Sequence, residues 1–275
     1  MKWKGRRASS NVEDRRGKSS KGLIGGGIGG IVILLVALIL GGNPTELLNQ
    51  LGGDVSTNTT DNQYVGTQEE EELAEFVSVV LADTEEVWTE IFKEEGLVYE
   101  EPILVIYKDQ VQSACGTAGS SVGPFYCPGD HKLYIDLSFY DELKREFKAP
   151  GDFAMAYVVA HEVGHHVQTL LKTDQNQQRA KSNDYSVRFE LQADYLAGVW
   201  AHHAKNMDLL DEGDLEEAIT AASAVGDDTI QKRAQGYVVP ESFTHGTSEQ
   251  RKRWFKKGFE AGNLDNGDTF KVKKP

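Results

Sequence analysis

Ala160-His161-Glu162-Val163-Gly164-His165-His166 is a stretch that predicts a helix carrying a metal site. Residues i and i+4 of an α-helix share a face, so the imidazoles of His161 and His165 project side by side and can bind one ion. Glu162 lies at the edge of that face, where it can take a proton from a water molecule without being a ligand. The H-E-x-x-H pattern therefore predicts a hydrolytic zinc site. The competing interpretation is a helix with two solvated or core histidines.

A catalytic zinc site takes three protein ligands and keeps a fourth position for water, so a third ligand is needed. The stretch Phe189-Glu190-Leu191-Gln192-Ala193-Asp194 predicts a second helix with Glu190 and Asp194 on one face. We expect Glu190 to be the third ligand of one zinc ion per chain, and Asp194 to orient a ligand histidine through its free ring N–H. The alternative for this pair is a solvated acidic helix face.

These two motifs together, H-E-x-x-H and E-x-x-x-D, resemble those of the gluzincin metallopeptidases. Three segments more closely resemble the bacterial membrane-anchored putative neutral zinc metallopeptidase family: Gly123-Pro124-Phe125-Tyr126-Cys127-Pro128, His161-Glu162-Val163-Gly164-His165-His166-Val167-Gln168 and Glu241-Ser242-Phe243-Thr244-His245-Gly246-Thr247-Ser248. The resemblance covers about residues 70–270 and the apolar segment near the N-terminus. It implies a zinc hydrolase acting on peptide or protein substrates, and it leaves the substrate itself open.

Peptide hydrolysis passes through a tetrahedral oxyanion, which a hydrogen-bond donor beside the metal stabilises. Our candidate for this donor, and the second catalytic residue after Glu162, is His245, just ahead of a helix expected from about residue 247 to 261. Tyr237 and Tyr185 are the reserve candidates. A histidine that bonds the backbone in a turn is an equal alternative, and spacing alone does not decide between them.

The net charge of −14 is unevenly distributed along the chain. Residues 1–21 carry eight basic and two acidic side chains, so the remaining chain is strongly acidic. An acidic body argues against nucleic acid as a partner. We interpret the basic residues 1–21 as a cytoplasmic tail flanking a membrane segment.

Residues 22–42 carry no charge and end in a strongly apolar run, which is enough for a transmembrane anchor. With the basic tail inside, a single-pass anchor would place the N-terminus in the cytoplasm and the catalytic domain outside. A cleaved signal peptide competes with this interpretation, although no A-x-A-like site follows. The spacing of Gly22, Gly26 and Gly30 would permit helix pairing into a homodimer, or it is merely a glycine-rich approach to the anchor.

Polar residues rich in Gly, Ser, Thr and Asn predict a flexible linker over residues 43–66, followed by the zinc metallopeptidase domain at 67–275. Thr67 and Glu70 form a capping-box pattern ahead of a long amphipathic helix. Residues 103–107 and 132–137 predict two strands. We expect a mostly helical α+β, zincin-like domain with a small antiparallel sheet, one edge of which would bind an extended peptide by analogy with gluzincins.

Cys115 and Cys127 are the two cysteines of the chain, and both lie between the predicted strands. In an exported domain an even pair at this separation predicts a disulfide. A metal site built on the two thiolates is the minor alternative.

The sequence thus favours a membrane-anchored zinc metallopeptidase in which Glu162 activates a water molecule to hydrolyse peptide bonds outside the cytoplasmic membrane. Two alternatives stay open. One is a catalytically inactive, zinc-stabilised binding or interaction protein of the cell envelope. The other is an interaction domain in which H-E-x-x-H occurs by chance and no metal is bound.

Overall fold

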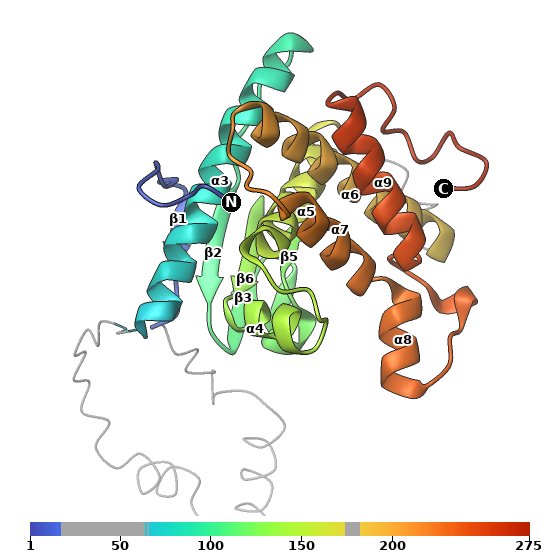
Figure 1. The fold of residues 1–275 in the computed structure, drawn as a ribbon, viewed down its shortest axis with the longest axis horizontal. Coiled ribbons are helices and arrows are strands. Elements are labelled where there is room, and N and C mark those ends of the chain that lie inside the picture. The colour runs from blue at the N-terminus through green and yellow to red at the C-terminus, as the bar shows by residue number, and fades with distance from the viewer. Residues whose placement is uncertain (18–63, 65, 174–181) are drawn as a thin grey trace, which may run out of the picture. The chain divides into compact units, whose positions relative to one another are not determined.

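The computed structural model describes residues 1–17, 64, 66–173 and 182–275 (Figure 1). Its chain divides into two compact units, Met1–Arg15 with Gly66–Pro275, and Arg16–Val65. The helices and strands described below all belong to the first unit. The predicted anchor at 22–42, its glycine spacing and nearly all of the linker lie outside the described residues. Among the helices that are described, none combines the length and apolar character needed to cross a bilayer.

The first unit is α+β and mostly helical, as predicted. Its first helix, α3 (Gln68–Glu94), begins at the capping box expected from the sequence, in which the side chain of Thr67 accepts from the Glu70 amide and that of Glu70 accepts from the Thr67 amide. The helix ends just before Gly96, whose φ of 70° is a conformation that glycine adopts without strain.

The sheet has four strands in the order β1-β2-β6-β5. Its central pair, β2 (Ile103–Tyr107) and β6 (Lys132–Asp136), runs parallel, while β5 (Phe125–Cys127) runs antiparallel to β6. The prediction of an antiparallel sheet is therefore wrong for the central pair. Parallel neighbours need a long crossover. The chain between them provides it, because it contains the antiparallel hairpin β3 (Gln110–Ser113) and β4 (Gly116–Gly119), the 3-10 turn Ser120–Val122 and β5.

The first fifteen residues are part of this folded unit. Within them β1 (Val12–Asp14) lies parallel to β2 as an edge strand of the sheet. The domain boundaries predicted from the sequence differ from this unit, because they separated residues 1–21 from the catalytic domain as a positively charged tail. Among the described residues, four of these basic side chains form ion pairs within the folded unit, namely Lys2, Arg6, Arg7 and Arg15.

Two buried acids of α3 take their partners from this N-terminal segment. Arg6 Nη1 lies 2.6 Å from Asp83 Oδ2, and the hydroxyl of Ser9 donates to the carboxylate of Glu85. Both acids are nearly inaccessible to solvent, with side-chain exposures of 3%. A buried carboxylate is costly unless it is paired. Residues 6–9 are therefore needed by the core of the domain.

A disulfide joins Cys115, in the turn of the β3–β4 hairpin, to Cys127 at the end of β5. Their Cα atoms are 5.8 Å apart. The bond ties the hairpin to the sheet, and because both sulfurs are used, these cysteines do not form the alternative thiolate metal site.

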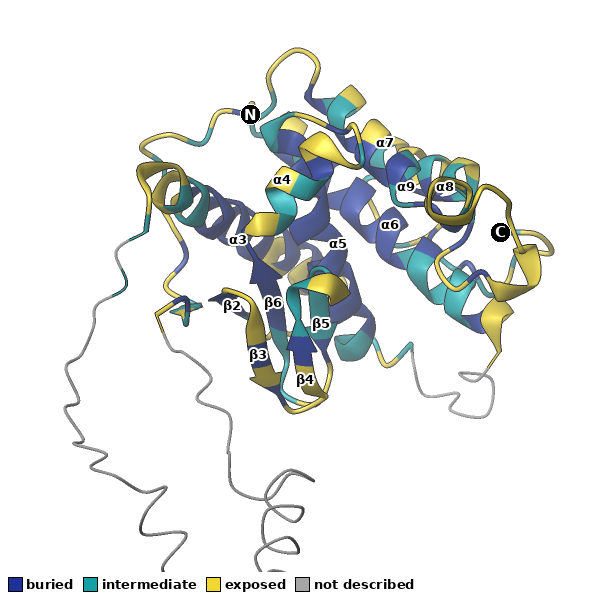
Figure 2. Ribbon diagram, turned by 90° about the horizontal axis from the view of Figure 1, so that it is seen from below, coloured by how far each residue is buried: buried dark blue, intermediate teal, exposed yellow. Residues whose placement is uncertain are grey.

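Helix α5 (Asp152–Leu170) is central, since it contacts α3 and the sheet as well as α6 (Asn183–Asn206) and α7 (Asp214–Ala224), while α9 (Ser248–Ala261) packs on α6 and α7 (Figures 1 and 2). Residues 153–168 of α5 are all buried. Most of these residues are apolar, and the polar ones among them are His161, Glu162, His165, His166 and Gln168. The helices are α4 (Ser138–Arg145), α5 (Asp152–Leu170), α6 (Asn183–Asn206), α7 (Asp214–Ala224), α8 (Asp227–Gln235) and α9 (Ser248–Ala261), with a 3-10 turn at Pro240–Ser242.

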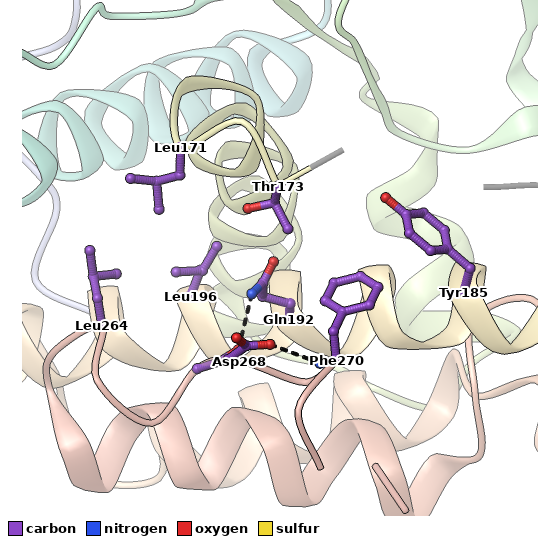
Figure 3. A pocket seen from close by; sticks show the side chains of 9 residues that line it. Leu171, Thr173, Tyr185, Gln192, Leu196, Leu264, Asp268 and Phe270 are labelled. Atoms are coloured by element: carbon purple, nitrogen blue, oxygen red, sulfur yellow. Dashed lines mark hydrogen bonds between the residues drawn. The ribbon is translucent and has the colours of Figure 1, made fainter. Parts of the chain in front are cut away.

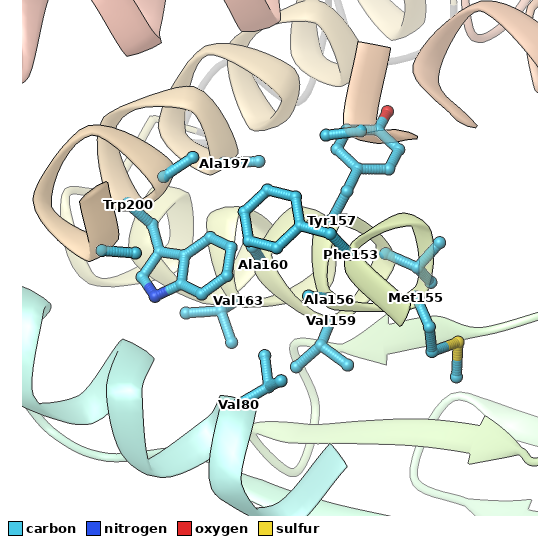
Figure 4. Packing of buried hydrophobic residues seen from close by; sticks show 14 of the residues in the cluster. Val80, Phe153, Met155, Ala156, Tyr157, Val159, Ala160, Val163, Ala197 and Trp200 are labelled. Carbon is cyan, nitrogen blue, oxygen red and sulfur yellow. The ribbon is translucent and has the colours of Figure 1, made fainter. Parts of the chain in front are cut away.

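The core between α5 and α6 is filled by large side chains (Figure 4). Phe153 of α5 stacks on Trp200 of α6, with ring centroids 5.6 Å apart. Further along α5 a small residue, Gly164, lets the backbones approach, because a Cβ there would lie 2.9 Å from the carbonyl oxygen of Ala193. This close crossing places the residues on either side of Gly164 directly against α6.

Candidate metal centre

The three residues predicted as metal ligands meet where α5 crosses α6. Glu190 Oε2 lies 3.1 Å from His161 Nε2 and 3.5 Å from His165 Nε2. One nitrogen of each ring and one carboxylate oxygen all lie within 4.8 Å of one another. The three side chains are largely withdrawn from solvent, with exposures of 9%, 11% and 18% for His161, His165 and Glu190.

This donor set fits zinc. Two imidazole nitrogens and one carboxylate oxygen are the ligands of catalytic zinc sites that leave a fourth position open. Burial opposes ionisation of Glu190, but the two neighbouring histidines outweigh it and hold the pKa of this carboxyl well below its usual range. Glu190 is therefore a carboxylate, the form that binds metal.

Asp194 lies one turn after Glu190 on α6 and contacts the other ring nitrogen of His161. His161 Nδ1 lies 2.9 Å from Asp194 Oδ1, which leaves Nε2 of the ring for the metal. Burial lowers the pKa of His161, yet the carboxylates of Asp194 and Glu190 together raise it to about 9. This arrangement is the orienting contact expected from the E-x-x-x-D spacing.

Gln168 contacts the second predicted ligand, His165, in the same way. The sequence analysis did not single out Gln168 as part of the site. Its Oε1 lies 2.8 Å from His165 Nδ1, so His165 also offers Nε2 to the centre. The side-chain amide of Gln168 donates to the carbonyl of Phe189 and to Gln192 on α6. The orientation of His165 is thus tied to the helix that carries Glu190.

A cleft of about 620 Å³ opens over the metal ligands. Glu162, the predicted general base, lines it beside His161 and His165, and so does His245. Much of the rest of its wall is apolar, including Val122, Pro124, Phe139, Phe147, Val158 and Ile230. The general base, the ligands and the candidate oxyanion donor therefore face one space large enough for a peptide segment.

His245 is held by Asp227, the first residue of α8. His245 Nδ1 lies 3.3 Å from Asp227 Oδ1. The other oxygen of Asp227 accepts the backbone amides of Thr244, His245 and Gly246, at 2.7, 2.7 and 3.0 Å. The hydrogen bond to Asp227 is the main cause that raises the pKa of His245 above its usual value. The ring is therefore anchored and favours its protonated form.

The two reserve candidates for the oxyanion donor lie elsewhere. Tyr185 lines a second cavity of about 380 Å³ together with Gln192 and Phe270, and none of the three predicted ligands lines that cavity (Figure 3). Tyr237 lies in the segment after α8 with 62% of its surface exposed, and it is not among the residues that line the cleft. Of the three candidates, only His245 is among the residues that line the cleft over His161, His165 and Glu190.

Three residues of the site escaped the sequence analysis, namely Gln168, Asp227 and Arg251. Gln168 lies one turn after His165 on the same helix face, so helical spacing carried a signal for it. Asp227 and Arg251 reach the site from α8 and α9, and no spacing relates them to the H-E-x-x-H motif. Their contribution depends on the tertiary fold.

The sequence model of the putative neutral zinc metallopeptidase family matches residues 1–270 of this chain. The chain belongs to this family. The match includes the N-terminal residues that form β1, as well as the ligands and His245.

Two curated relatives support the same assignment. The uncharacterized protein YpfJ of Escherichia coli strain K12 is 46% identical over 284 aligned positions, which cover 98% of this chain and 99% of the relative. The uncharacterized protein Rv2575 of Mycobacterium tuberculosis is 43% identical over 187 positions, covering 62% of this chain and 63% of the relative. No solved structure is significantly similar to the chain.

Proposed function

We propose that this chain is a zinc-dependent peptidase that hydrolyses peptide bonds in the cleft above α5 and α6. The observation that carries the proposal is the convergence of His161, His165 and Glu190 at one point, with Glu162 lining the same cleft. Membership of the zinc metallopeptidase family supports the same chemistry.

In this proposal His161, His165 and Glu190 would hold a zinc ion, and the chemistry such an ion would supply there is that of a Lewis acid for the scissile carbonyl and for water. Glu162 takes the proton of the attacking water and passes it to the nitrogen of the leaving amine. Protonated His245 donates a hydrogen bond to the oxygen that becomes negative in the transition state. Asp194 and Gln168 keep the two ligand rings in place during these steps.

The peptide would enter along β5. This strand ends the order β1-β2-β6-β5, so one of its edges has no neighbour among the described strands. Phe125 and Tyr126 of β5, together with the preceding Pro124, line the cleft. An extended substrate added to this edge would pass over the metal ligands, as the analogy with gluzincins suggests.

Turnover of a quenched peptide library by the zinc-loaded full chain tests the proposal, with Glu162→Gln as the decisive variant. This substitution keeps the size of the side chain and removes the base, so we expect at least a hundredfold loss of turnover with zinc retained. Tyr237→Phe, outside the cleft, is the matched control and should cleave like the wild type. Zinc binding without cleavage by the wild type would instead support an inactive binding protein of the envelope.

We also propose that the peptidase works outside the cytoplasm. The disulfide between Cys115 and Cys127 supports this location, because disulfides persist in oxidising compartments. Membrane attachment through 22–42 and pairing of two chains there stay predictions.

We further propose that the N-terminus lies outside the cytoplasm, in place of the cytoplasmic N-terminus that the sequence predicted. β1 and β2 pair within one compact unit, and a single membrane crossing between residues 15 and 66 would separate them. In our proposal residues 1–15 therefore lie in the same compartment as the catalytic cleft. The positive charge near the N-terminus suggested the opposite side, but Arg6 is occupied by a buried acid of α3.

A further inference from the structure

Arg251 of α9 lines the cleft beside the predicted ligands and is almost fully buried, with 5% of its side chain exposed. Its Nε donates to Asp194 Oδ2 at 2.8 Å, and its Nη2 donates to Asp194 Oδ1 at 2.9 Å. The guanidinium thus binds both oxygens of the Asp194 carboxylate, which in turn contacts His161. Such a two-point contact fixes the plane of a carboxylate as well as its position.

The same guanidinium also lies against the ring of His161, with Nη2 at 3.3 Å from Nδ1 and 3.4 Å from Nε2. It makes two further contacts that tie helices together. Nη1 donates to the carbonyl of Val225 at the end of α7, at 3.2 Å, and Nη2 donates to the hydroxyl of Tyr157 on α5, at 3.1 Å. Tyr157 in turn donates to Asp194 Oδ1 at 2.6 Å. Since Tyr157 lies one turn before His161, Asp194 is fixed from α5 and α9 at once.

The close packing of α9 on α6 makes this reach possible. A Cβ at Gly258 would lie 1.9 Å from the carbonyl oxygen of Tyr195, and one at Gly198 would lie 2.0 Å from that of Phe255. The two glycines let the helix backbones touch. Arg251, two turns before Gly258 on α9, is thereby held against Asp194.

A fully buried ion pair is weak evidence for a role in stability, because the cost of removing both charges from water cancels much of their attraction. Well-packed apolar side chains in place of Arg251 and Asp194 would stabilise the core at least as well. What apolar side chains would not provide is a carboxylate of fixed orientation next to a ligand histidine. Asp194 without Arg251 would be a buried negative charge whose Oδ1 still contacts Tyr157 and His161 but whose Oδ2 has lost its partner.

We propose that Arg251 is a positioning residue of the metal centre, which acts through Asp194 to hold His161 in the orientation that binds zinc. The inference rests on the proposed zinc site, but it does not require that the site cleaves peptides. It predicts an effect on zinc affinity that can be measured without any substrate.

The experiment measures zinc affinity of the full chain by competition with a chromogenic chelator, for wild type, Arg251→Lys, Arg251→Met, Asp194→Asn and the double variant Asp194→Asn/Arg251→Met. We expect Arg251→Met and Asp194→Asn each to weaken zinc binding by about 10–100-fold, the range for residues that support a ligand. Arg251→Lys keeps the charge but loses the planar fork, so we expect a several-fold loss.

The double variant separates a positioning role from a merely structural one. If Arg251 acts through Asp194, the double variant should bind zinc within about twofold of Asp194→Asn alone, whereas independent effects would multiply. It also replaces the ion pair by two neutral side chains, so it gives a result even if Arg251→Met alone fails to fold. Arg6→Lys, which alters another pair between an arginine and a buried aspartate, is the matched control and should bind zinc like the wild type.

Wild-type affinity in Arg251→Lys and in the double variant would overturn the inference, and so would losses that multiply. Absence of zinc binding by the wild type would overturn both the inference and the proposed function. Tight zinc binding by a wild type that cleaves no peptide would contradict the proposed function alone.

Discussion

His165 Nδ1 lies 2.8 Å from Oε1 of Gln168, a side chain with no exposed surface. The contact leaves the other nitrogen of His165 for the metal. We predict that Gln168→Leu, which keeps the volume but offers no acceptor, weakens zinc binding by about 10–100-fold. Chelator competition on the purified full chain measures this change.

Thr169→Val is the control for this prediction. Thr169 bonds to the backbone carbonyl of His165 rather than to its ring, at 3.2 Å. Its loss should therefore leave zinc affinity within about twofold of the wild type. Equal losses in Gln168→Leu and Thr169→Val would show that the helix, and not the ring contact, determines binding.

The N-terminal segment should be needed for stability. Arg6→Met leaves Asp83 buried without its cation, and we expect a loss of about 3 kcal/mol, the low end for breaking a buried pair because Arg6 is partly exposed. Urea unfolding followed by circular dichroism measures the change. Lys2→Met, which removes an exposed pair with Asp208, should unfold at nearly the wild-type urea concentration.

A fragment starting at residue 67 lacks β1 and should fail to fold. A fragment as stable as the full chain would contradict the view that the N-terminal segment is needed for stability.

The position of the N-terminus can be tested in intact cells. Lys2 Nζ lies 2.8 Å from Asp208 Oδ1, and the Lys2 amide donates to the carbonyl of Leu209. We predict that cysteines at positions 2 and 208 are joined by a short bis-maleimide reagent, whereas either single variant is not. The native cysteines do not interfere, because they are bonded to each other. Labelling of position 208 but not of position 2 by a membrane-impermeant maleimide would place them on opposite sides and contradict the prediction.

The pH dependence of cleavage should report the contact between His245 and Asp227. The hydrogen bond to Asp227 raises the pKa of His245, so the donor form is kept until pH exceeds that raised value, and activity should fall as pH rises through it. Asp227→Asn removes the anion and lowers this pKa. The alkaline limb of the kcat/KM profile should therefore move to lower pH. An unchanged alkaline limb in Asp227→Asn would remove His245 from the proposed mechanism.

Local sequence rules predicted the elements that depend on local interactions. The capping box at Thr67 and Glu70, the strands at 103–107 and 132–136, and the helix from 248 to 261 appear as expected. The proposed site could also be reached from the sequence, since i, i+4 spacing puts His161 and His165 on one helix face, and Glu190 and Asp194 on another. What spacing could not tell is that the two faces oppose each other, which depends on the crossing at Gly164.

Long-range pairing accounts for the features that the sequence did not predict. β1 has three residues in a basic stretch, and its partner strand lies some ninety positions further along the chain. No local pattern signals such a pairing, nor does one specify that β2 and β6 run parallel. Asp227 and Arg251 are likewise ordinary surface residues by sequence. They become part of the site only because α9 packs against α6 and α8 packs against α7 and α9.

The most direct test of the account is the zinc content of the purified full chain, measured by mass spectrometry of the metal after gel filtration. We predict one zinc ion per chain in the wild type and in Glu162→Gln, and almost none in His161→Ala or Glu190→Ala, because these two variants remove ligands. Zinc retained by Glu190→Ala, or a wild type that holds none, would contradict the metal centre and the function built on it.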